Sequence, residues 1–107
     1  MTAITYNKLV RDKIPEIIEK DHKKAICDKL SDKQYIEMLD KKLSEELNEY
    51  QESKEFEELA DMLEVMYAIT EARGYSVSDL ENIRVSKAEK RGAFKKKILL
   101  KTVVEEK

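Results

Sequence analysis

The sequence predicts a mainly α-helical protein, an antiparallel helical bundle, and three observations support this. Two glycines and one proline among 107 residues leave few positions that would interrupt a helix. Charged residues make up 41% of the chain, with many Glu and Lys, as in helices that keep one face in water. Apolar residues recur every three or four positions through the middle of the chain, which is the helical period. The length fits a single domain over residues 1–107.

Two helices are expected in the first half of the chain. The first begins near Lys13, with Asp12 as its cap and Pro15 tolerated in its first turn. The second begins at "SDKQ", because Ser31 and Gln34 have the spacing of a capping box. The apolar residues that then follow at helical spacing are Ile36, Leu39, Leu43, Leu47 and Tyr50.

The helix expected over residues 56–72 is apolar nearly all the way round and ends at Gly74. Such a helix is buried on most sides, so it should be the central helix of the bundle. A chain of this length buries a small fraction of its surface and often relies on oligomerisation. We therefore expect a homodimer or a homotetramer.

The last third of the chain predicts one more helix and a small β element. Ser78 and Glu81 form a second capping-box pair, which opens a helix that ends before Gly92. Residues 25–29 alternate weakly, and residues 96–101 lie in a tail with β-branched and apolar character. These two stretches could pair as a small two-stranded element.

The charges are distributed unevenly along the chain. Residues 45–64 contain nine acidic residues and one lysine, whereas residues 84–101 contain eight basic residues and one acidic residue. This separation suits a charged ligand, or a metal together with an anion. The alternative is that both stretches form solvated helix faces.

Several classes of protein are disfavoured by the composition. A single cysteine, Cys27, excludes an internal disulfide. No apolar run approaches the length of a membrane span, and the N-terminus lacks the apolar region of a signal peptide, so a cytoplasmic protein is expected. The net charge of -2 and the lack of a recognised nucleic-acid motif make nucleic acid an unlikely partner.

Four carboxylates are expected to meet between the two central helices. Glu46 and Glu49 are three residues apart, as are Glu58 and Asp61, so each pair shares one helix face. The short connection makes the helices antiparallel neighbours, which sets Glu46 opposite Asp61 and Glu49 opposite Glu58. Mg²⁺ prefers such oxygen ligands and would remove their repulsion. Glu45 points about 100° away from Glu46 and could orient a water.

A less specific interpretation of these acids also stands. Glu is a strong helix former, and most Glu-rich stretches are solvated surface. Glu57 and Glu58 could be acids that the helix dipole favours in a first turn. Asp61 argues for a site, because a poor helix former lies between Ala60 and Met62 in an apolar helix.

Three stretches of the chain carry a resemblance to a known family. "EELNE" followed by "ELAD" resembles the E-E-x-x-E … E-x-x-D signature of the MazG-like, all-α nucleotide pyrophosphohydrolase superfamily. "YNKLVRDKIPEII" and "KAEKRGAF" resemble its phosphoribosyl-ATP pyrophosphohydrolase-like branch. The chain departs in two places: only eight residues separate Glu49 from Glu58, and Ala93 stands where the branch often has a second glycine.

The resemblance implies an all-α core and Mg²⁺-dependent hydrolysis of a nucleoside triphosphate or related nucleotide to the monophosphate and pyrophosphate. Mn²⁺ could replace Mg²⁺. The implied metal ligands are Glu46, Glu49, Glu58 and Asp61. Two alternatives remain open: phosphoribosyl-ATP hydrolysis in histidine synthesis, and a non-catalytic nucleotide-binding or regulatory protein.

The expected mechanism gives further residues a role. Glu45 or Glu49 would orient the attacking water or take its proton. Basic side chains should balance the charge of the phosphates, and Arg is favoured because its fork matches phosphate. The candidate phosphate contacts are Lys8, Arg11, Lys87 and Arg91, each of which could instead be solvated surface.

Overall fold

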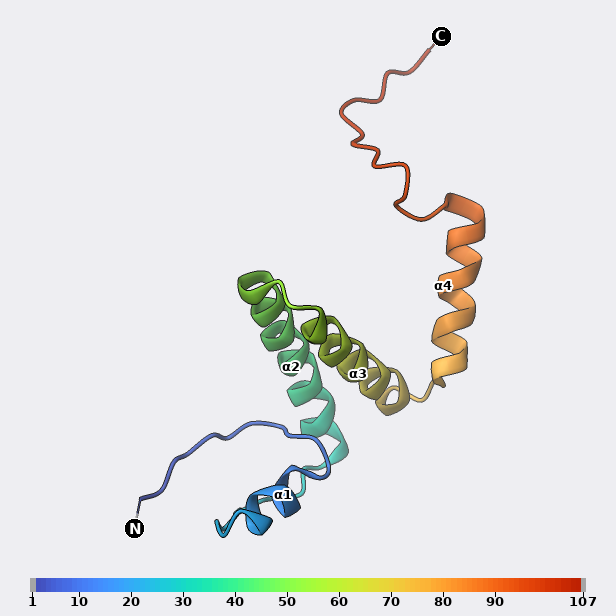
Figure 1. Cartoon of the computed structure of the whole chain (residues 1–107). Helices are drawn as coiled ribbons and strands as arrows, with labels where there is room; N and C mark the ends of the chain where they lie inside the picture. The colour runs from blue at the N-terminus through green and yellow to red at the C-terminus, as the bar shows by residue number, and fades with distance from the viewer. Residues whose placement is uncertain (1, 107) are drawn as a thin grey trace. The chain divides into compact units, whose positions relative to one another are not determined.

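The structure is a computed structural model that describes residues 2–106, and within them it contains four helices and no strand (Figure 1). The helices are α1 (Ile14–Lys20), α2 (Asp32–Ser53), α3 (Phe56–Ala72) and α4 (Val77–Arg91). The prediction of a mainly α-helical protein is therefore confirmed. The chain divides into two compact units, one up to Tyr75 and the other from Ser76 onward. That residues 1–107 form a single domain stays a prediction.

The first unit is organised around the pair α2 and α3, which pack against each other as a helical hairpin (Figure 1). Leu39 of α2 and Val65 of α3 are the buried apolar residues of this pair. Leu59, Leu63 and Met66 of α3 keep 37 to 42% of their surface exposed. The sequence predicts that this helix is buried on most sides. Within one chain, α3 instead leaves these apolar side chains partly exposed.

Local signals define both ends of α2. Gln34 donates its backbone N–H to the Ser31 hydroxyl at 3.2 Å, and Ser31 donates its backbone N–H to the Gln34 side chain at 3.1 Å. The predicted capping box is thus confirmed. At the other end Lys54 adopts a left-handed conformation, with φ of 59°, and donates its N–H to the Tyr50 carbonyl at 2.8 Å. Glu55 is then the N-cap of α3, so the turn of the hairpin is very short.

The N-terminal boundaries of α1 and α4 differ from the predictions. Lys13 rather than Asp12 is the N-cap of α1, and its side chain makes no capping hydrogen bond. The capping box of α4 is formed by Ser76 and Asp79, two residues before the predicted pair. Both pairs have the same spacing, so spacing alone could not choose between them.

Glu81 of the predicted capping box and Asp79 of the observed one both have carboxyls with lowered pKa values. Glu81 lies within α4 and accepts a hydrogen bond from the Arg84 Nε at 2.9 Å, which lowers the pKa of Glu81. Hydrogen bonds from the backbone and side chain of Ser76 lower the pKa of Asp79, as expected for a capping carboxylate.

The predicted two-stranded element is wrong for the described residues. Residues 25–29 and 96–101 contain no strand. Ile26 and Ile98 to Leu100 stay largely exposed, so neither stretch has an apolar surface to pack on. An isolated two-stranded pair is marginally stable in water without such support.

No helix within residues 2–106 combines the length and the apolar character needed to cross a membrane.

Candidate metal centre

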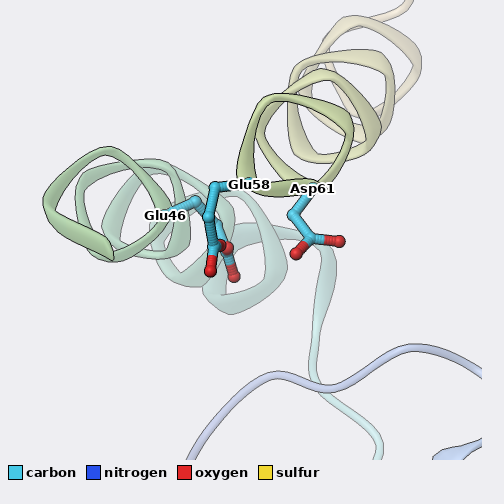
Figure 2. Close-up of side chains that lie close together, drawn as sticks. All are labelled: Glu46, Glu58 and Asp61. Atoms are coloured by element: carbon cyan, nitrogen blue, oxygen red, sulfur yellow. The ribbon is translucent and has the colours of Figure 1, made fainter. Parts of the chain in front are cut away.

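Three carboxylates meet where α2 packs against α3. Glu46 comes from α2, and Glu58 and Asp61 come from one face of α3 (Figure 2). Each residue offers an oxygen that lies within 4.8 Å of the oxygens offered by the other two. The helical spacing of three and the packing of the hairpin thus bring together three of the four residues that were expected to converge.

Glu49, the fourth expected residue, lies beside this group with its side chain exposed. Its charge raises the pKa of both Glu46 and Glu58. We call the set Glu46, Glu49, Glu58 and Asp61 the carboxylate cluster. Glu46 is buried, Glu58 and Asp61 are partly buried, and Glu49 forms the exposed rim of the cluster.

Two oxygens of the cluster are buried without a hydrogen-bond partner in the described structure: Oε2 of Glu46 and Oε2 of Glu58. Glu46 keeps only 7% of its surface exposed. A buried polar oxygen that is left unsatisfied costs free energy, so natural proteins rarely keep one without a ligand, water or other partner. Grouped carboxylate oxygens are the ligands that a hard divalent cation prefers, so these residues fit Mg²⁺ or Mn²⁺.

The electrostatics of the cluster agree with this fit. Burial raises the pKa of Glu46, and repulsion from Glu49 and Asp61 raises it further, while Lys42 acts in the opposite direction. Burial also raises the pKa of Glu58, with additional contributions from Glu49, Asp61 and Glu46. Like charges held together resist ionisation, and a divalent cation would remove that resistance.

Two basic side chains contact the cluster. Arg11 donates a hydrogen bond from Nη2 to the Asp61 Oδ1 at 2.7 Å. The Lys42 Nζ lies 3.5 Å from the Glu46 Oε1, one helical turn earlier on α2. Arg11 is one of the predicted phosphate contacts, whereas the contact of Lys42 with Glu46 was not predicted. The spacing of four residues between Lys42 and Glu46 is the signal that could have found it.

Glu45 and Lys8 lie together at a different place, a small pocket between the N-terminal segment (residues 2–13) and α2. The pocket has a volume of about 20 Å³, which is enough for about one water. Its lining consists of Asn7, Lys8, Leu9, Met38, Lys41, Lys42 and Glu45. Glu45 is not part of the group of three carboxylates, so a role in orienting water there stays a prediction.

The other two expected phosphate contacts belong to the second unit. Lys87 and Arg91 lie on α4, four residues apart, and both are exposed. Their contact with phosphate stays a prediction.

Comparisons with known proteins do not assign the chain to a family. No family model matches it, and neither a curated protein nor a solved structure matches it. The similarity to MazG-like pyrophosphohydrolases therefore stays a prediction from the three sequence stretches. The geometry of the carboxylate cluster is the structural observation that bears on function.

Proposed function

We propose that this protein is a cytoplasmic, Mg²⁺-dependent nucleotide pyrophosphohydrolase that cleaves a nucleoside triphosphate or related nucleotide to the monophosphate and pyrophosphate. The observation that supports this best is the carboxylate cluster, with two buried oxygens that have no partner in the described structure. The MazG-like pattern of the sequence supplies the reaction class. The preferred cation is Mg²⁺, and Mn²⁺ also suits carboxylate oxygens as ligands.

Glu46, Glu58 and Asp61 would hold the cation, with Glu49 completing the set from the exposed rim. A bound divalent cation supplies charge neutralisation for the phosphates and lowers the pKa of a coordinated water. The hairpin of α2 and α3 supplies the rest of the positioning, because ligands on two packed helices are held more precisely than ligands on loops.

Glu49 is the better placed of the two candidates for orienting the attacking water. Its carboxyl lies next to Glu46 and Glu58 and is also exposed to solvent, whereas Glu45 lines the separate pocket with Lys8. A carboxylate within hydrogen-bonding reach can take the proton that water loses as it attacks phosphorus. Arg11 would contact the phosphates near the cluster, because its guanidinium lies at Asp61 and its fork matches phosphate.

Two alternatives share the same site and differ in substrate or turnover. The chain could hydrolyse phosphoribosyl-ATP in histidine synthesis, since "YNKLVRDKIPEII" and "KAEKRGAF" resemble the phosphoribosyl-ATP pyrophosphohydrolase-like branch. It could also bind nucleotide as a regulatory protein without hydrolysis. An assay of pyrophosphate release from a panel of nucleotides separates these alternatives from the main proposal.

We expect pyrophosphate release from at least one member of a panel of nucleoside triphosphates and phosphoribosyl-ATP. Release should require Mg²⁺ or Mn²⁺ and stop when EDTA is added. Asp61→Asn should lose it, because the substitution removes a ligand charge at nearly constant shape. Glu64→Gln is the matched control, since Glu64 is an exposed acid of the same helix outside the cluster. A folded protein that binds Mg²⁺ and nucleotide without release would support the regulatory alternative.

We also propose that the enzyme is a homodimer or a homotetramer. Leu59, Leu63 and Met66 leave an apolar surface on α3 that a second copy could cover. Sedimentation velocity at micromolar concentration should therefore give the mass of two or four chains. A monomer of 12.5 kDa under those conditions would contradict this proposal.

A further inference from the structure

The contact between Arg11 and Asp61 joins two parts of the first unit that are fifty residues apart in the chain. Asp61 is at once the partner of Arg11 and a member of the carboxylate cluster. The ion pair is partly open to water, with 58% of the Arg11 side chain and 41% of the Asp61 side chain exposed. A guanidinium therefore lies at the place where the proposed metal centre needs a free carboxylate.

We infer that Arg11 and the divalent cation compete for Asp61, so that cation binding frees the Arg11 guanidinium to receive a phosphate. This inference rests on the proposed metal centre. A guanidinium keeps its charge at any ordinary pH, so a divalent cation bound to Asp61 would repel it and favour its movement away from this carboxylate. The expected order of binding is therefore the cation first and the anion of the substrate second.

The backbone around Arg11 would keep the released side chain close to the centre. The Arg11 carbonyl accepts a hydrogen bond from the Ile14 N–H at 3.1 Å, in the turn that precedes α1. On its other side, Asn7, Lys8 and Leu9 lie against α2 and line the small pocket there. The guanidinium can therefore leave Asp61 by rotation of the Arg11 side chain, without displacement of the N-terminal segment.

The test is the affinity for Mn²⁺ alone, measured by electron paramagnetic resonance of the free ion with the full-length protein. We expect Arg11→Ala to bind Mn²⁺ roughly two- to fivefold more tightly than wild type at low salt, since a partly exposed ion pair is worth up to about 1 kcal/mol. The difference should shrink in 0.5 M salt, because salt screens exposed charges. Arg11→Lys, which keeps the positive charge, should bind close to wild type.

The matched control is Arg73→Ala. Arg73 donates to the Asp40 Oδ2 at 3.2 Å and is exposed to about the same extent as Arg11, but this ion pair lies outside the carboxylate cluster. Its loss should leave the Mn²⁺ affinity unchanged. Circular dichroism melting curves establish that each variant is folded.

Each outcome decides the question. Tighter binding by Arg11→Ala alone supports competition. Unchanged or weaker binding by Arg11→Ala, with wild type and Arg73→Ala binding normally, overturns the competition and leaves the metal centre standing. If wild type and every variant fail to bind Mn²⁺, the metal centre itself is refuted, and this inference falls with it.

Discussion

Replacing Glu46 with glutamine should reduce Mg²⁺-dependent pyrophosphate release by at least about 100-fold, which is the usual cost of removing one electrostatic contact to a reacting group. Glu46 is the most buried member of the carboxylate cluster, and one of its oxygens has no partner. Glutamine has nearly the same shape, so the expected loss comes from the missing charge. The initial rate of pyrophosphate release on the preferred nucleotide measures it.

The control for this variant is Glu37→Gln, an exposed acid on the same helix, α2. It should keep the wild-type rate. Glu46→Gln should be at least as resistant to urea as wild type in EDTA, because it removes a charge that burial and Glu49 disfavour. A Glu46→Gln enzyme with the wild-type rate would show that the cluster is not the catalytic metal centre.

The second large effect concerns stability in the absence and presence of Mg²⁺. At a Mg²⁺ concentration 100 times its dissociation constant, binding should stabilise the folded state by about 2.7 kcal/mol. Urea denaturation followed by far-UV circular dichroism, in EDTA and in Mg²⁺, measures this difference. The Asp61→Asn variant should show little or no stabilisation, and an equal response from that variant would place the cation elsewhere.

The metal-free protein should also lose stability as the pH rises. Glu46 and Glu58 have pKa values raised above those of the unfolded chain, so the folded state binds more protons than the unfolded state. Their stabilising contribution is complete below the ordinary glutamate pKa of about 4.3 and is lost as the pH rises through the raised values. In EDTA, the free energy of unfolding should therefore fall over that window, and saturating Mg²⁺ should remove this fall.

Two other carboxylates titrate in the opposite sense and lie outside this window. The pKa values of Asp79 and Glu81 are lowered, so their contribution is present above the ordinary values and lost as the pH falls through the lowered ones. A decline in stability that appears only on acidification would contradict the raised pKa values of Glu46 and Glu58. Measurements from pH 4.5 upward separate the two groups.

Much of the hairpin and its carboxylates could be predicted because the signals are local. The Ser31–Gln34 capping box and the helical period placed α2, and the spacing of three within each acid pair placed two carboxylates on one face. The convergence of Glu46 with Glu58 and Asp61 followed once the short turn made the helices antiparallel. No long-range information was needed for these steps.

The features that escaped prediction depend on choices between equivalent local signals or on distant contacts. Ser76–Asp79 and Ser78–Glu81 satisfy the same capping pattern, and only the fold selects the first. The pairing of Arg11 with Asp61 joins residues fifty positions apart, and no periodicity encodes it. The small β element was predicted from side-chain character alone, but neither stretch has a surface to support it.

The very short turn at Lys54 limits how this protein could change during evolution. Loops on a protein surface usually accept insertions, because little depends on their length. In this hairpin, one residue added at the start of α3 would turn Glu58 and Asp61 about 100° away from Glu46, since each helical residue advances by that angle. The length of this turn therefore sets whether the carboxylates of the two helices meet.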